Sequence, residues 1–135
     1  MDWRSRRKSV VSGNKIFLDT NAFIYFFEGR SRITELVVQT LVIYFSPISE
    51  IELLSASHLT EAEIDQIKEF LSLCQRVELS SEIIEQTIAI RRQHQIKIPD
   101  AIIAASAISL NIPLVSADTE FRKIADLVLV SDILT

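Results

Sequence analysis

The chain has 135 residues, enough for one domain that buries about two-thirds of its unfolded surface, and its 48% hydrophobic residues exclude a disordered protein. Two glycines and three prolines argue against a turn-rich all-β fold, and one cysteine excludes both an internal disulfide and a cysteine-based zinc site. The net charge of −4 does not by itself favour nucleic-acid binding, although a metal-binding nuclease can be acidic because its cations change the sign of the site.

Residues 1–14 are polar, aperiodic and basic through Arg4, Arg6, Arg7 and Lys8, which predicts a flexible extension. A basic arm that contacts RNA is the alternative. Residues 15–135 then form a single domain. No apolar run approaches the roughly 20 residues that span a bilayer, and the N-terminus lacks the apolar core of a signal peptide. We therefore expect a cytoplasmic protein that does not contact membranes.

Short apolar runs alternate with helical patterns along the domain. Lys15–Asp19 is typical of a buried strand, after which Asn21 is a good N-cap for a helix that Gly29 closes. Capping-box spacings at Ser49 and Thr60 predict the starts of two later helices. The other predicted strands are 41–46, 76–79, 113–116 and 127–130, and the other helices begin near Ser31, Ser80 or Ser81, Pro99 and Asp118.

Short apolar strands separated by helices indicate an α/β fold with a parallel sheet of about five strands between two helical layers, an α/β/α sandwich. Ligands of such sheets bind beyond the carboxyl ends of the strands. Asp19 ends the first predicted strand and Asp118 follows the strand 113–116, whereas Glu52 and Asp100 lie near helix starts. All four carboxylates are therefore expected at one edge of the sheet.

Each acidic residue also has an ordinary structural explanation. Asp19 could accept a hydrogen bond in the turn after its strand, and Glu52 could complete the capping box that Ser49 opens. Asp100 could interact with a helix dipole, and Asp118 could cap the short helix after it. Together, however, the four charges would repel one another strongly without a cation. Oxygen-only ligation favours Mg²⁺ or Mn²⁺ over zinc.

Four segments resemble, in order, the motif series of PIN-domain proteins and most of all the VapC-type toxins of toxin–antitoxin pairs. They are IFLDTNAFIYFFEG, SPISEIELLSA, KIPDAIIAASA and PLVSADTEFRKI. The resemblance spans residues 15–130 and implies a metal-dependent ribonuclease with an acidic quartet. Matched position by position, the quartet is Asp19, Glu52, Asp100 and Asp118, with Glu52 chosen over Glu50.

We therefore expect hydrolysis of RNA at a Mg²⁺ or Mn²⁺ site, with an antitoxin as protein partner. Asp19, Asp100 and Asp118 would bind the metal, and Glu52 would ligate it or orient the attacking water. The supporting donors would be Thr20, Asn21 and Ser116. Two alternatives from another class are a catalytically inactive PIN-like module that binds a partner, and a receiver-like signalling module.

The first two predicted helices carry more apolar side chains than one sheet face can cover. This excess predicts a two-fold homodimer through their surface, which would also take an apolar peptide from an antitoxin. The residues assigned to that surface are Phe23, Tyr25, Phe26, Phe27, Ile33 and Val37.

Overall fold

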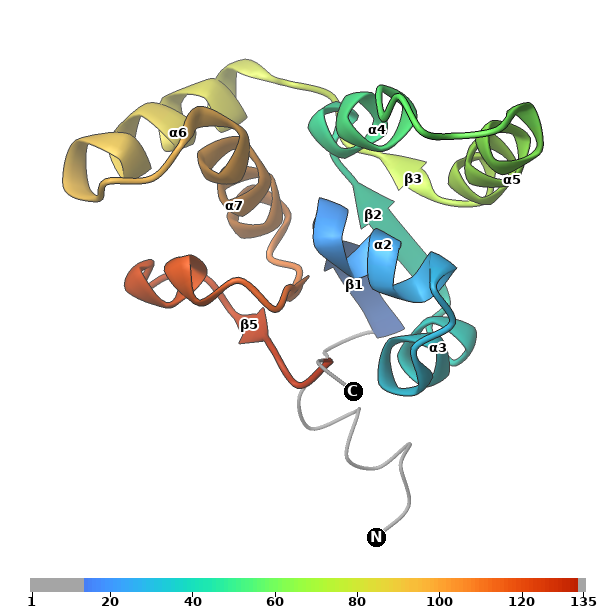
Figure 1. Ribbon diagram of the computed structural model, residues 1–135. Coiled ribbons are helices and arrows are strands. Elements are labelled where there is room, and N and C mark those ends of the chain that lie inside the picture. Colours follow the sequence, from blue (N-terminus) through green and yellow to red (C-terminus); the bar gives the residue numbers. More distant parts are fainter. Residues whose placement is uncertain (1–13, 134–135) are drawn as a thin grey trace, which may run out of the picture.

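The computed structural model describes residues 14–133, so the predicted basic extension lies, except for Asn14, outside the described residues. Five parallel strands form one sheet in the order β3-β2-β1-β4-β5 (Figure 1). This arrangement confirms the predicted α/β fold with a parallel sheet of five strands. The strands are β1 (Lys15–Leu18), β2 (Val42–Phe45), β3 (Gln75–Arg76), β4 (Leu114–Val115) and β5 (Leu129–Val130).

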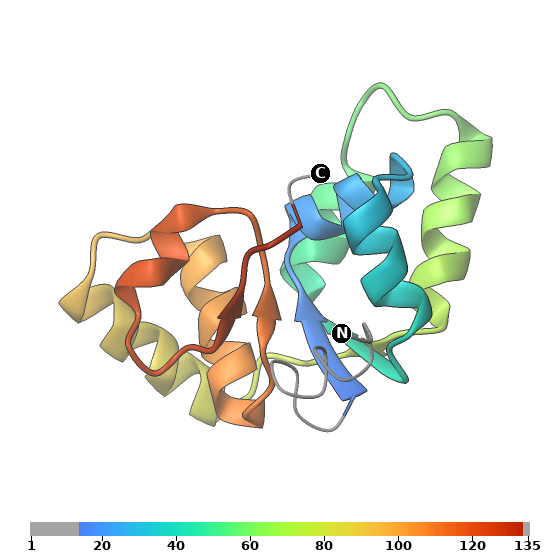
Figure 2. The same ribbon diagram turned by 90° about the horizontal axis from the view of Figure 1, so that it is seen from below.

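Helices cover both faces of the sheet, which makes the three layers (Figures 1 and 2). Side chains alternate along β1, so that Ile16 and Leu18 face one apolar core and Phe17 faces the other. The first core is closed mainly by α2 (Thr20–Phe27), α3 (Ser31–Val38) and α5 (Glu61–Ser72), and the second by α6 (Ser81–Gln93), α7 (Ile98–Leu110) and the 3₁₀ helix η2 (Thr119–Lys123). Helix α4 (Pro47–Leu54) contributes Leu53 to the first core and Ile48 to the second.

Two helix starts differ from the prediction. Helix α2 is capped by Asp19 rather than Asn21, and α4 is capped by Ser46, with Pro47 in its first turn, rather than by Ser49. In both cases the true cap directly follows the last residue of a strand, so the chain turns at once from the sheet into the helix. The capping box of Thr60 with Glu63 and the cap at Ser80 are confirmed.

The surface that was predicted for a homodimer is mostly interior. Phe23 and Ile33 are fully buried and Val37 nearly so, while Tyr25 and Phe26 pack partly against the core. The sequence could not show that α5 covers α2, with Phe70 against the rings of Phe23, Phe26 and Phe27. That prediction is therefore wrong about the surface, of which only Phe27 keeps substantial exposure.

The strand order places a topological switch point between β1 and β4. From β1 the chain runs outward through β2 and β3, then returns through α6 and α7 to pair β4 with the other side of β1. Open parallel sheets bind their ligands in the crevice beside such a point, at the carboxyl ends of the strands. Among residues 14–133, no helix is both long and apolar enough to cross a membrane.

Candidate functional site

The four predicted carboxylates all come from elements that meet at this switch point. Asp19 follows β1, and Asp118 follows the neighbouring strand β4. Glu52 lies on α4, which begins directly after β2, and Asp100 lies in the first turn of α7. Each residue is thus held by a strand end or by a helix anchored in a core.

Asp19 is the buried member of the group, with 4% of its surface exposed. Its Oδ1 accepts a hydrogen bond of 2.8 Å from the amide of Ala22, and its Oδ2 accepts one from the Ser116 hydroxyl. Burial nevertheless raises the pKa of Asp19 from 3.8 to about 6, because these two bonds offset desolvation only in part and Asp100 and Asp118 add repulsion. A buried carboxylate that faces other carboxylates is stabilised when a cation binds beside it.

Ser116 connects the ends of β1 and β4. While its hydroxyl donates to Asp19, its oxygen accepts a 3.0 Å hydrogen bond from the amide of Asp118. Asp118 in turn caps η2, since its Oδ1 accepts a 2.9 Å hydrogen bond from the amide of Glu120. The predicted supporting role of Ser116 thus has a geometric basis, and Asp118 combines a capping role with its place in the site.

Thr20, the first residue of α2, holds the carboxylate of Glu52 in place. The Thr20 hydroxyl donates a 2.6 Å hydrogen bond to Glu52 Oε1, and it lies 2.9 Å from the Ser49 hydroxyl. Glu50 instead pairs with Arg76, whose Nη1 lies 3.1 Å from Glu50 Oε1. The two glutamates are therefore separated as the sequence reasoning expected. Asn21, the third predicted supporting residue, is exposed in the first turn of α2.

Asp100 is half-buried, and several charged side chains act on its carboxylate. Burial is the largest cause that raises its pKa, followed by repulsion from Asp118 and Glu52, while Lys97 acts in the opposite direction. Glu120 also raises the pKa of Asp100, and sequence reasoning missed this residue. Its position two residues after Asp118 was visible in the sequence, but its approach to α7 depends on how η2 packs.

The carboxylates interact electrostatically, but they do not form a closed metal cage. Among residues 14–133, no three Asp, Glu, His or Cys side chains are arranged to hold one metal ion. The three expected metal ligands, Asp19, Asp100 and Asp118, therefore do not all reach one ion directly. Their all-oxygen chemistry still suits a hard divalent cation, which usually keeps several water ligands.

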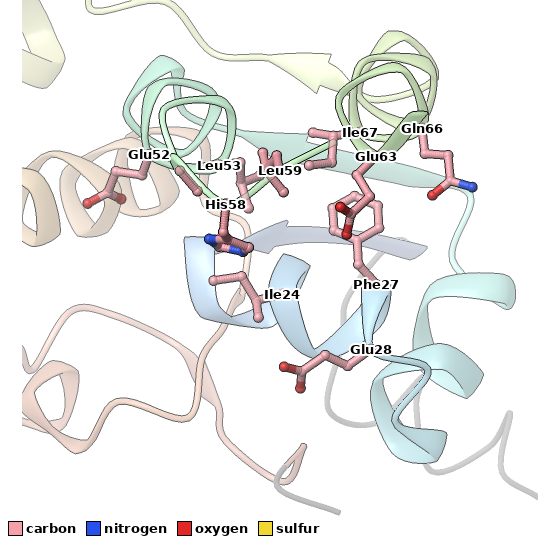
Figure 3. Close-up of a pocket in the computed structure, with 11 residues that line it drawn as sticks. Ile24, Phe27, Glu28, Glu52, Leu53, His58, Leu59, Glu63, Gln66 and Ile67 are labelled. Atoms are coloured by element: carbon pink, nitrogen blue, oxygen red, sulfur yellow. The ribbon is translucent and has the colours of Figure 1, made fainter. Parts of the chain in front are cut away.

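An apolar cavity of about 400 Å³ begins beside Glu52, between α2, α4 and α5 (Figure 3). Figure 3 shows Glu52 at one end, with its carboxylate pointing away from Leu53 and Leu59. The other apolar lining residues are Ile24, Phe27, Ala56 and Ile67, and the other polar ones are Glu28, His58, Glu63 and Gln66. The cavity thus joins an apolar floor to an acidic rim at the edge of the carboxylate group.

Comparisons with known proteins agree on one family. A family model described as PIN domain matches residues 16–127. Among solved structures, the chain is similar to a toxin–antitoxin complex from Klebsiella pneumoniae, with 25% identity, a TM-score of 0.74, and coverage of 85% of this chain and 95% of the other. A comparison with curated proteins gave no match.

Two further structures belong to VapBC pairs. One is VapBC2 from Rickettsia felis, bound to a DNA fragment from its promoter, with 25% identity, a TM-score of 0.75, and coverage of 86% and 97% of the two chains. The other is VapBC-1 from nontypeable Haemophilus influenzae, with 28% identity, a TM-score of 0.73, and coverage of 86% and 96%.

Proposed function

The chain belongs to the PIN-domain family, and from this premise we propose that it is a Mg²⁺- or Mn²⁺-dependent endoribonuclease and the toxin of a type II toxin–antitoxin pair. One observation carries the proposal. Asp19 is buried at the switch point of the sheet, its pKa is raised to about 6, and the charges that act on it are those of Asp100 and Asp118. A purely structural carboxylate is normally paired with a cation, so this group suits a site completed by metal.

Asp19, Asp100 and Asp118 would hold the cation, in part through water because no three of the described side chains reach one ion directly. When bound, a divalent cation polarises a scissile phosphate and lowers the pKa of a water molecule that attacks it. The protein supplies the rigid placement of the carboxylates. Ser116 fixes one oxygen of Asp19 and the backbone of Asp118, so the two ligands keep their relative position.

Glu52 would orient the attacking water and accept its proton. Its hydrogen bond to Thr20 leaves the second carboxylate oxygen available for that role, and the same bond fixes the side chain against rotation. Attack by water on the phosphorus needs no ribose 2′-hydroxyl. The products would be a 5′-phosphate and a 3′-hydroxyl.

The proposed antitoxin would bind at the cavity between α2, α4 and α5. Its apolar floor suits apolar side chains of a peptide, and its acidic rim suits a basic side chain that reaches toward Glu52. This proposal is supported by the fold, which is shared with proteins solved in toxin–antitoxin complexes. Association with a second copy stays a prediction, without the buried surface first assigned to it, and light scattering at micromolar concentration tests it.

A PIN-like protein that binds a partner without cleaving RNA is the alternative. The carboxylate group speaks against it, because four mutually repelling acids serve no purpose in a site that only binds a peptide. The receiver-like alternative is excluded by membership of the PIN-domain family.

The decisive experiment is a cleavage assay on tRNA, rRNA and mRNA with Mn²⁺, with EDTA, and with two matched variants. Asp100→Asn should abolish cleavage because it removes ligand charge with little change in shape. Asp126→Asn makes the same chemical change at an exposed position outside the site and should cleave like the wild type. Cleavage that persists in EDTA or in Asp100→Asn would refute a metal-dependent nuclease at this site.

A further inference from the structure

Two lysines border the carboxylate group on the side of α7. Lys97 is the N-cap residue of α7 and precedes Asp100 by three positions, a spacing that places both near one face of the first turn. The backbone carbonyl of Lys97 accepts a 2.9 Å hydrogen bond from the amide of Ala101, the residue after Asp100, which fixes Lys97 at the start of the helix. Lys97 is exposed, so its ammonium group is open to a ligand from solvent.

Lys123 reaches the same place from η2. Its Nζ donates a 3.5 Å hydrogen bond to the carbonyl of Gln95 and lies 2.5 Å from Glu120 Oε2. Glu120 adjoins the carboxylate group, since its amide donates a 2.9 Å hydrogen bond to Asp118 Oδ1. Lys123 therefore lies between Glu120 and the carbonyl of Gln95, and Gln95 precedes Lys97 by two residues.

The loop between α6 and α7 is held in place for this arrangement. Arg91 Nε donates a 3.1 Å hydrogen bond to the carbonyl of Ile96, while Lys123 contacts the carbonyl one residue earlier. Ile96 itself is buried in the second core. The backbone that carries Lys97 is thus anchored on both sides.

Lys97 and Lys123 do not lie where they do in order to neutralise the carboxylates. The ion pair of Lys123 with Glu120 has side chains 41% and 54% exposed, and such pairs contribute little to stability. The buried Asp19, which needs a counter-charge most, has negative charged neighbours. An RNA strand, in contrast, carries a negative phosphate at every nucleotide, so a strand whose one phosphate reaches the carboxylate-bound cation must place its next phosphate nearby.

We propose that Lys97 and Lys123 bind the phosphate next to the scissile one and direct the RNA strand from the carboxylate group across the loop 94–97. The inference rests on the proposed function, and it describes how the RNA substrate of that function is positioned. The lysines are positioning residues. They act on the strand through its backbone, so they confer binding without base specificity.

The test separates binding from cleavage. Binding of a short fluorescein-labelled oligouridylate is measured by anisotropy with Mg²⁺ over a series of salt concentrations. The background is Glu52→Gln, which should block cleavage and keep the three residues proposed to hold the cation. In that background, Lys97→Gln and Lys123→Gln should each raise the Kd about three- to tenfold and lower the slope of log K against log salt by about 0.7 to 1. Lys97→Arg, which keeps the positive charge, should leave both the Kd and the salt slope unchanged.

Lys68→Gln is the matched control. Lys68 is exposed on α5, on the other side of the molecule from α6 and α7 (Figure 1), and its replacement should change neither the Kd nor the salt slope. Equal Kd values for the Lys97, Lys123 and Lys68 variants would overturn the inference, even if the wild type cleaves RNA. A wild type that cleaves no RNA would instead refute the proposed function, while the anisotropy series would still decide whether these lysines bind the strand.

Discussion

Replacement of Asp19 by asparagine should stabilise the metal-free protein at neutral pH. The pKa of Asp19 rises from its ordinary value of 3.8 to about 6 in the folded protein, so the folded state holds this proton more tightly than the unfolded chain. Protonated Asp19 therefore contributes fully to the free energy of unfolding below about pH 4, and this contribution is lost as the pH rises through about 6. A difference of about two pKa units corresponds to ~3 kcal/mol.

Asparagine stays neutral at every pH and can also cap α2, so Asp19→Asn should keep the fold. Urea unfolding in EDTA should give equal stabilities for the two proteins near pH 4, and a gain for Asp19→Asn that grows to ~3 kcal/mol above about pH 6. The difference between the proteins isolates Asp19, because the other carboxylates titrate in both. A difference that is constant over this pH range would refute the assignment of the raised pKa to Asp19.

Mn²⁺ should remove most of this difference in stability between the wild type and Asp19→Asn. Mn²⁺ at about 100 times its Kd should stabilise the wild type by ~2.7 kcal/mol and have little effect on Asp19→Asn. Asp126→Asn, at an exposed position, serves as control and should respond like the wild type. Equal responses of all three proteins would mean that the cation binds elsewhere.

Three further changes test how the site is held. Ser116→Ala removes a donor to Asp19, so the loss of stability should move to higher pH in the same urea experiments; an unchanged profile would show that the bond is weak. Thr20→Val releases Glu52 and should lower kcat for RNA cleavage about 10- to 100-fold with an unchanged circular dichroism spectrum, whereas normal kcat would remove Thr20 from the mechanism. Ser46→Ala removes the cap of α4 and should lower the free energy of unfolding by about 1 kcal/mol in urea; no loss would indicate that α4 is held by packing alone.

The fold could be predicted because short apolar strands and helical patterns alternate without interruption. The positions of Asp19 and Asp118 at strand ends followed from this alternation alone. Helix starts were harder, because two polar residues competed for the same role. Ser49 opens a capping-box spacing, yet Ser46 precedes a proline that suits the first turn, and the structure has the helix begin there.

Tertiary neighbours explain the remaining differences. Glu120 reaches Asp100 only because η2 packs beside α7, which no local pattern encodes. The apolar residues of α2 were assigned to a dimer surface because the sequence does not show that α5 covers them through Phe70. The spacing of the carboxylates also depends on packing, so the sequence could indicate their common edge but not their distances.

The strand order has a consequence for the protein during its own synthesis. Asp19 and Glu52 emerge early from the ribosome, but Asp100, Ser116 and Asp118 come from the last third of the chain, and β4 must insert beside β1 before these groups meet. Translation proceeds from the N-terminus, so an incomplete chain lacks half of the carboxylates and the serine that aligns them. The proposed nuclease would therefore be harmless to the messenger and ribosome that produce it until nearly all of it has been translated.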